Sequence, residues 1–146
     1  MDVKIKQVDG ITFIGKGETN HWVSIDGPEQ FNGSNAGCRP KELLLIALGS
    51  CTGSDVVSIL KKKRVNIDSL SINVTGDVTQ DHPKTFSNIH ITYQFHGENL
   101  PEKDLERAIE LSQNKYCPIA AMIQKHCPIG YSYKIFYSSK EKENQD

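Results

Sequence analysis

The feature that most constrains the fold is a predicted long helix, from Pro40 to about Lys63, whose first half is apolar on every side. Proline fits the first turn of a helix, where its missing N–H costs nothing. The cations from Lys61 to Arg64 suit the negative end of the helix macrodipole. Between these ends, Leu43 to Leu48 form an unbroken apolar run. We expect this half of the helix to be enclosed by protein on all sides.

The next stretch of the same helix, from Gly49 to Ser54, consists of small residues. Two of them are glycines, and each costs about 1 kcal/mol relative to alanine inside a helix. Close approach of another helix or of a backbone would offset that cost. The helix is therefore predicted to be a central element of the protein.

Length and charge limit the class of protein. The 146 residues suffice for one domain with a sizeable core, and the hydrophobic share of 37% is modest, so an obligate dimer would help each subunit complete its core. A formal net charge of -1 provides no field for nucleic acid or an anionic membrane, and we expect neither as a partner. We see no apolar signal segment at the start, and the run Leu43 to Leu48 is too short to span a bilayer. A cytoplasmic location is expected.

Alternation of apolar and polar residues and turn residues define the other elements. Strands are predicted at residues 3–8, 11–14, 21–25, 69–74, 89–95 and 130–137. Residues 27–38 form a glycine- and asparagine-rich loop, of a length that is often functional. A second helix starts at Pro101 and a third, short one runs from Pro118 to about Lys125. The order β-β-β-α-β-β-α-α-β predicts an α+β fold, with one domain over residues 1–138 and a charged, disordered tail over residues 139–146.

The four cysteines, Cys38, Cys51, Cys117 and Cys127, are expected to lie in a reducing compartment. No two of them have the spacing of a zinc ribbon or finger, so we expect no metal and no other cofactor. Taken alone, Cys51 has the position of an ordinary buried residue on the inner face of the long helix, where most thiols are inert.

Cys117 has a more suggestive position, because Pro118 directly follows it. Proline favours the first position of a helix, which makes Cys117 the predicted N-cap. The positive end of the helix macrodipole is expected to lower the pKa of a thiol there. Electrostatics alone therefore favours Cys117 as the nucleophile, since Asp55 lies one turn after Cys51 and disfavours a Cys51 thiolate.

Two segments together carry a resemblance to a known family: Arg39-Pro40-Lys41-Glu42-Leu43-Leu44-Leu45-Ile46-Ala47-Leu48-Gly49-Ser50-Cys51, continued by Asp55-Val56-Val57-Ser58-Ile59-Leu60, and Leu111-Ser112-Gln113-Asn114-Lys115-Tyr116-Cys117. The chain resembles the OsmC/Ohr family of osmotically inducible and organic hydroperoxide resistance proteins, most closely its YhfA-like branch, over roughly residues 3–137. The resemblance implies an intertwined homodimer in which curved antiparallel sheets surround central helices.

The resemblance also implies a cysteine-based peroxidase of the oxidative stress response, acting on organic hydroperoxides or hydrogen peroxide. Cys51 is then the peroxidatic thiol that becomes a sulfenic acid, and Cys117 resolves it by forming a Cys51–Cys117 disulfide. An external dithiol reduces that disulfide by exchange. These roles reverse the ranking of the two thiols by electrostatics.

Some residues depart from the family pattern. Its peroxidases stabilise the thiolate with an arginine from the N-terminal strand region, and no arginine precedes Arg39 here. They also have glutamate directly after the helix-start proline, where this chain has Lys41 followed by Glu42. Arg39 is the candidate replacement cation, with Lys41 and His21 as others, and Glu42 is the candidate group to hold it. Arg39 as a solvated loop charge, and Glu42 as ordinary dipole compensation, remain alternatives.

Two further hypotheses therefore stay open beside the peroxidase. The chain can be a non-catalytic redox-sensing or small-ligand-binding member of the family, or a structural dimer whose cysteines are inert. Cys38 and Cys127 match no family position and are interpreted as incidental thiols.

Overall fold

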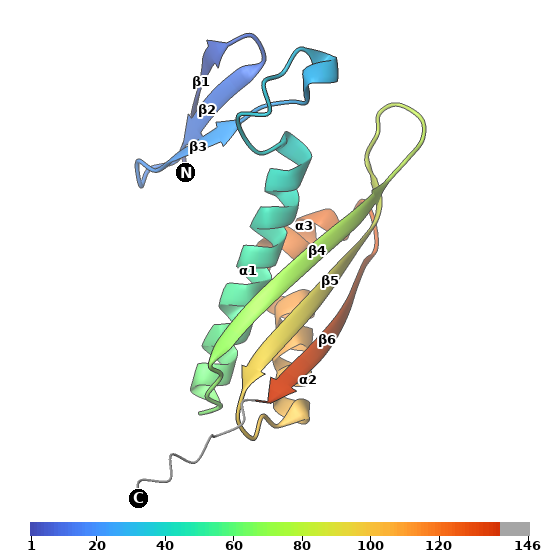
Figure 1. Cartoon of the computed structure of the whole chain (residues 1–146). Coiled ribbons are helices and arrows are strands. Elements are labelled where there is room, and N and C mark those ends of the chain that lie inside the picture. The colour runs from blue at the N-terminus through green and yellow to red at the C-terminus, as the bar shows by residue number, and fades with distance from the viewer. Residues whose placement is uncertain (138–146) are drawn as a thin grey trace, which may run out of the picture. The chain divides into compact units, whose positions relative to one another are not determined.

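The computed structural model describes residues 1–137. The disordered tail expected at residues 139–146 lies outside the described residues. The chain divides into two compact units, Met1–Leu44 and the part from Leu45 onward. The elements follow the order predicted from the sequence, within an α+β architecture (Figure 1). A single domain over residues 1–138 stays a prediction.

The first unit contains a three-stranded antiparallel sheet in the order β1-β2-β3. Its strands are β1 (Lys4–Asp9), β2 (Thr12–Lys16) and β3 (Trp22–Ile25). The loop predicted at residues 27–38 follows, with one short 3₁₀ helix, η1 (Glu29–Phe31). Cys38 closes the loop against β3, because its N–H donates to the Ser24 carbonyl at 3.0 Å and its carbonyl accepts from Asp26 N–H at 3.1 Å.

The carboxylate of Asp26 organises this loop from inside. The residue is only 2% exposed, and its oxygens accept hydrogen bonds from the backbone N–H groups of Gly27 at 2.7 Å, Ser34 at 3.0 Å and Ala36 at 3.1 Å. These donors, Ala36 foremost, stabilise the charged form and lower the pKa of Asp26. One buried charge thus fixes the path of a long irregular segment.

The second unit contains a sheet in the order β4-β5-β6. β4 (Ser69–Val78) and β5 (Phe86–Gly97) are antiparallel, as the family resemblance implies, whereas β5 and β6 (Ile129–Tyr137) are parallel. The parallel pair follows from the connection, because α2 (Glu102–Leu111), the π-helix η2 (Ser112–Tyr116) and α3 (Pro118–Ile123) return the chain to the starting end of β5.

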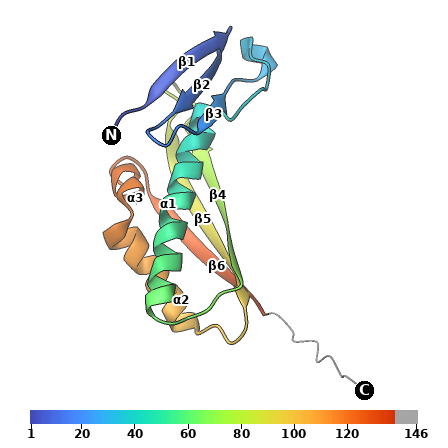
Figure 2. The same ribbon diagram turned by 90° about the vertical axis from the view of Figure 1, so that its left-hand side faces the viewer.

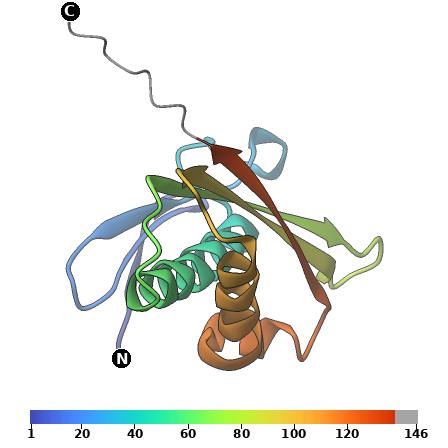
Figure 3. The same ribbon diagram turned by 90° about the horizontal axis from the view of Figure 1, so that it is seen from below.

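The core of this unit lies between one face of the sheet and the helices. Figure 3 shows α1 (Pro40–Lys62) and α2 against the same face, and Figure 2 shows α1 running along the strands. Alternate side chains of β5 point into this space. The fully buried apolar side chains of the described residues are Leu48, Val56, Leu60, Ile89, Ile91, Tyr93, Phe95, Leu105, Ala108, Ile109 and Ala120.

The glycines in the small-residue stretch of α1 face β4. A Cβ at Gly53 would lie 2.6 Å from Ile72 Cδ1, and one at Gly49 would lie 3.0 Å from Val74 Cγ2. The close approach predicted from the sequence is confirmed, but strand side chains make it rather than another helix or a backbone.

The expectation that the half of α1 from Leu43 to Leu48 is enclosed on all sides is wrong for the single chain. Leu44 is 51% exposed and Ile46 is 55% exposed. Farther along the helix, Val57 is also 44% exposed, because the sheet and α2 cover only the opposite side. Among the described helices, α1 has the length and apolar composition of a membrane span, a test that core helices of soluble proteins also pass. Its covered side belongs to the core cluster.

We predict that the free energy of unfolding of Asp26→Asn depends less on pH in the acid range than that of the parent protein. The folded state lowers the pKa of Asp26, so its stabilising effect is complete above the unfolded value of about 3.9 and is lost as pH falls through that range. Urea denaturation at several pH values between neutrality and pH 3 should show the parent losing stability more steeply than the variant. Asp81→Asn, at an exposed position, is the control. If the stability of Asp26→Asn fell with pH as steeply as that of the parent, the role of Asp26 would be contradicted.

Candidate functional site

The structure brings together two thiols that are far apart in the sequence. Cys51, in α1, and Cys117, directly before α3, have their Sγ atoms within 4.8 Å of each other, and a carboxylate oxygen of Asp55 lies within 4.8 Å of both. Cys51 is half-buried, whereas Cys117 is only 2% exposed. An oxidant arriving from solvent therefore meets Cys51 first.

Local backbone structure positions Cys117. The π-helix η2 ends with Cys117 N–H donating to the Ser112 carbonyl at 2.9 Å, and Pro118 then starts α3. Cys117 Sγ accepts a hydrogen bond from Ala120 N–H at 3.3 Å. The N-cap predicted from the Cys-Pro pair is therefore confirmed.

The pKa predicted for Cys117 is wrong in direction. Burial, in the first place, and a hydrogen bond with Cys51 raise the pKa of Cys117 to about 11, and the opposing hydrogen bond from Ala120 N–H does not compensate. The six-residue helix and the hydrogen bond at its start stabilise the Cys117 thiolate, but the loss of surrounding water destabilises this thiolate more. The structure thus removes the electrostatic reason for choosing Cys117 as the nucleophile.

A buried hydroxyl cluster, formed by Thr52, Tyr93, Ser112 and Gln113, lies beside the thiols. Thr52 Oγ1 is 2.6 Å from Tyr93 Oη and 2.8 Å from Ser112 Oγ. Gln113 Nε2 donates to Tyr93 Oη at 2.8 Å and to Thr52 Oγ1 at 3.1 Å. Among the described residues, no buried side-chain N or O atom lacks a partner. The cluster joins α1, β5 and η2, the elements around the two thiols.

This cluster ends on the carboxylate of Asp55. Ser112 Oγ donates to Asp55 Oδ2 at 3.0 Å, so the other hydroxyls can all donate in the same direction, from Tyr93 to Thr52 and on to Ser112. Sequence reasoning missed the roles of Thr52, Tyr93 and Gln113. The available signal was polarity at inward positions, since Tyr93 lies among alternating core residues of a strand and Ser112 continues the inner face of a helix.

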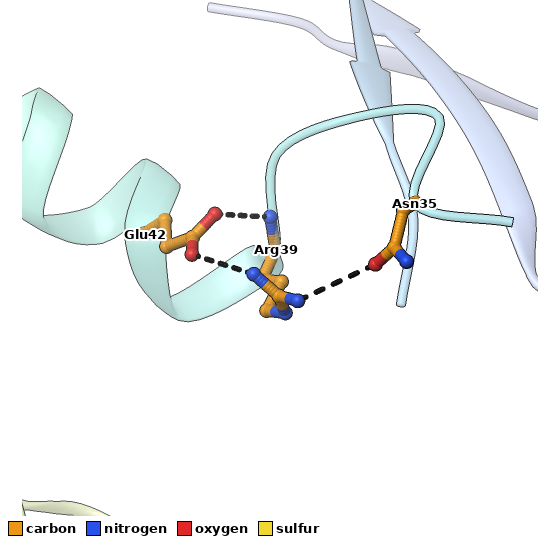
Figure 4. A network of polar contacts seen from close by, with 3 residues as sticks. All are labelled: Asn35, Arg39 and Glu42. Carbon is orange, nitrogen blue, oxygen red and sulfur yellow. Dashed lines mark hydrogen bonds and ion pairs between the residues drawn. The ribbon is translucent and has the colours of Figure 1, made fainter. Parts of the chain in front are cut away.

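Arg39 and Glu42, the other predicted catalytic residues, pair with each other (Figure 4). Arg39 Nη1 lies 3.0 Å from Glu42 Oε1, and Arg39 N–H donates to Glu42 Oε2 at 2.9 Å. The Arg39 backbone N–H, followed by the Arg39 guanidinium, lowers the pKa of Glu42. Arg39 Nη2 also donates to Asn35 Oδ1 at 3.4 Å. Both residues belong to the first unit, and their role at the thiol site stays a prediction.

The remaining candidates are divided between the two units. His21, Lys41 and Cys38 belong to the first unit, where His21 and Lys41 are exposed. Cys127 belongs to the second unit and is 4% exposed, and burial raises the pKa of its thiol. None of these four residues is part of the trio formed by Cys51, Asp55 and Cys117.

A pocket of about 340 Å³ borders Asp55 on the side of the next helical turn. Its lining is mixed, with Ile59 and Leu111 as apolar walls, the ring of Tyr116 next to Cys117, and Lys62 at the rim. A volume of this size accommodates a small organic molecule. The arrangement therefore combines a half-exposed thiol, a second thiol within reach and an adjoining mixed pocket.

Comparison with known proteins places this geometry in context. A family model described as OsmC-like protein matches residues 33–132. Protein YhfA of Escherichia coli strain K12 is 33% identical over 135 residues, which cover 92% of this chain and 98% of that protein.

Two solved structures show similar folds. A hypothetical protein from Aquifex aeolicus VF5 has a TM-score of 0.83 at 33% identity, over 94% of this chain and 97% of that one. The organic hydroperoxide resistance protein OhrB of Bacillus subtilis has a TM-score of 0.67 at 13% identity, over 92% and 98% of the two chains. At that identity the likeness to OhrB concerns the fold alone.

We predict that alkylation separates the two thiols of the site. Cys51 is half-exposed, whereas Cys117 is buried and its pKa is raised to about 11, so iodoacetamide at pH 8 should label Cys51 at least roughly 10-fold faster. Peptide mass spectrometry of the native, reduced protein measures both rates. Buried Cys127 is the internal control and should label slowly. Equal labelling of Cys51 and Cys117, or complete resistance of both, would contradict the prediction.

Proposed function

The chain belongs to the OsmC-like protein family, and on that premise we propose that it is a thiol-dependent peroxidase that reduces organic hydroperoxides or hydrogen peroxide. The observation that supports this activity best is the pair of sulfur atoms within 4.8 Å of each other, one half-exposed and one buried. A fold neighbour, OhrB of Bacillus subtilis, is named as an organic hydroperoxide resistance protein. The proposal includes a cytoplasmic setting, in which thiols are kept reduced.

The first step belongs to Cys51. Its thiolate attacks the terminal oxygen of the hydroperoxide, the O–O bond breaks, and the leaving alkoxide takes a proton to become the alcohol, or water from hydrogen peroxide. Cys51 is then a sulfenic acid. The pocket of about 340 Å³ beside Asp55 is the candidate place for the organic part of the substrate.

The second step belongs to Cys117. Its sulfur attacks the sulfenic sulfur of Cys51, the S–O bond breaks, and water leaves as the disulfide forms. The two sulfurs must close from within 4.8 Å to about 2.05 Å, which rotation of the side chains can supply. Because the pKa of Cys117 is about 11, this thiol needs a base, and we assign that role to the carboxylate of Asp55. An external dithiol then returns the protein to its reduced state by exchange.

A nearby positive charge would stabilise the Cys51 thiolate. Arg39 and Glu42 are our candidates from the family pattern, and their ion pair at 3.0 Å is consistent with a cation held in a fixed position. The group that the structure places within 4.8 Å of Cys51 Sγ is the carboxylate of Asp55. This carboxylate favours a second candidate function, a redox-sensing or small-ligand-binding protein that reacts without efficient turnover.

We predict that Cys51→Ser lowers consumption of cumene hydroperoxide by roughly 100-fold or more, because it removes the nucleophile. Cys117→Ser should allow one turnover and leave a Cys51 sulfenic acid that dimedone traps. The matched controls Cys38→Ser and Cys127→Ser should consume hydroperoxide at the parent rate.

Stopped-flow measurement of hydroperoxide loss, with a dithiol as the reductant, decides between the two functions. If the Cys51→Ser variant were as fast as the parent, the peroxidase proposal would be wrong. A parent whose Cys51 reacts no faster than free cysteine would favour the sensing or ligand-binding function instead.

We further propose that two copies of the chain form a homodimer through α1 and β4. A groove of about 900 Å³ lies there, and its walls are mainly apolar: Leu45, Ile46, Val57, Leu70, Ile72 and Val74. Contiguous exposed apolar surface of this kind is a feature of protein interaction sites. A second copy also accounts for the apolar sequence on the open side of α1, and the family resemblance implies the same partner.

We predict that Ile46→Asp shifts the protein to monomers, because it places a charge on a residue that is 55% exposed in the single chain and would be buried by the partner. Sedimentation velocity at micromolar concentration measures the change. Met122→Asp, at an apolar position of α3 that is 59% exposed and lies outside the groove, is the matched control and should leave the dimer intact. A parent protein that sediments as a monomer would overturn the dimer proposal.

A further inference from the structure

We propose that the reduced site binds one zinc ion through Cys51, Asp55 and Cys117. One ligand atom from each of these residues lies within 4.8 Å of the other two. Cys51 and Asp55 are one helical turn apart in α1 and therefore lie on the same side of it. Cys117 approaches from the start of α3, so three donors from two elements converge on one point.

The donor set suits a divalent ion of intermediate softness. Zinc binds thiolate sulfur at about 2.3 Å and carboxylate oxygen at about 2.0–2.2 Å, almost always with tetrahedral geometry. Those bond lengths place neighbouring donors roughly 3.5–3.8 Å apart. The observed separations are within 4.8 Å, so zinc binding requires only that the three donors close by roughly 1 Å. Each sulfur releases its proton to solvent when it binds the ion.

Contacts outside the three ligands are already in place. Ser112 Oγ donates to Asp55 Oδ2 at 3.0 Å, which orients the carboxylate and keeps its other oxygen available. Ala120 N–H donates to Cys117 Sγ at 3.3 Å and holds that sulfur toward the centre of the trio. Hydrogen bonds of this kind fix ligand geometry in metal sites and contribute to affinity.

Charge gives an independent reason for a cation at this position. A carboxylate and two sulfur atoms lie close together, and Cys117 and the hydroxyl cluster around them are shielded from water. A divalent ion would compensate the negative charge that these three ligands carry once they bind it. Three protein ligands leave one position of a tetrahedral ion open to water or another small ligand, and Cys51 is only half-buried.

The proposal has a consequence for redox chemistry that does not depend on peroxidase activity. A Cys51–Cys117 disulfide takes both sulfurs away from the metal, so zinc binds the reduced protein alone. Zinc and oxidants therefore compete for the same two thiols. Binding of zinc would protect the reduced pair until the ion is removed.

The test is a zinc titration of the reduced, metal-free protein in competition with a chromophoric chelator. One ion should bind per chain, and Cys51→Ser, Cys117→Ser and Asp55→Asn should each weaken binding at least roughly 10-fold. Cys38→Ser and Cys127→Ser are the matched controls and should bind with parent affinity. Cobalt in place of zinc should give a sulfur-to-metal charge-transfer band that is lost in Cys51→Ser and in Cys117→Ser.

Circular dichroism of each variant confirms that it is folded before its affinity is compared. The absence of zinc binding in the parent, or parent affinity in both folded site-cysteine variants, would overturn the proposal. So would loss of binding in Cys38→Ser or Cys127→Ser. The titration contains no peroxide, so a protein that binds zinc but does not consume hydroperoxide refutes the peroxidase proposal alone, and the converse result refutes the zinc site alone.

Discussion

The hydroxyl of Thr52 is the contact on which the thiol site depends. It lies in the middle of α1 and is fully buried, with Tyr93 Oη at 2.6 Å and Ser112 Oγ at 2.8 Å. A buried hydroxyl without partners would cost about 1–3 kcal/mol, so these contacts keep α1, β5 and η2 in one relative position. That position sets the separation of Cys51, in the same helix, from Cys117, at the end of η2. The distance between the sulfur atoms of Cys51 and Cys117 therefore depends on the hydrogen bonds of neighbouring polar side chains.

Burial affects the pKa of Cys117 more than the start of the following helix does. The start of α3 offers Cys117 a backbone N–H and the positive end of a dipole, yet the pKa of this thiol is raised to about 11. Desolvation opposes the charged form more strongly than one short helix favours it. The half-exposed Cys51 is left as the thiol that solvent-borne oxidants or metal ions meet first. Exposure to solvent, rather than distance from a helix end, therefore distinguishes the two cysteines.

The open side of α1 links the fold to its expected assembly. The covered side of this helix completes the core of the second unit, and its glycines admit the side chains of Ile72 and Val74 from β4. The other side exposes Ile46 and Val57 along an apolar groove. The helix is therefore apolar on two sides, one of which packs in the core while the other is exposed in the single chain.

Periodicity and turn residues sufficed to predict the order of the elements, the ends of α1 and the N-cap at Cys117, because each depends on residues close together in the chain. The segment from Arg39 to Cys51 and the segment from Leu111 to Cys117 were together enough for the family. The sequence could not show which distant residues meet. It did not reveal the approach of Cys51, Asp55 and Cys117 to within 4.8 Å, the hydrogen-bond partners of Thr52, or the parallel pairing of β6. The pKa of Cys117 belongs with these, since desolvation depends on which segments cover the sulfur. Local patterns determine which elements form, whereas only the packing of those elements decides which side chains meet and how much water they keep.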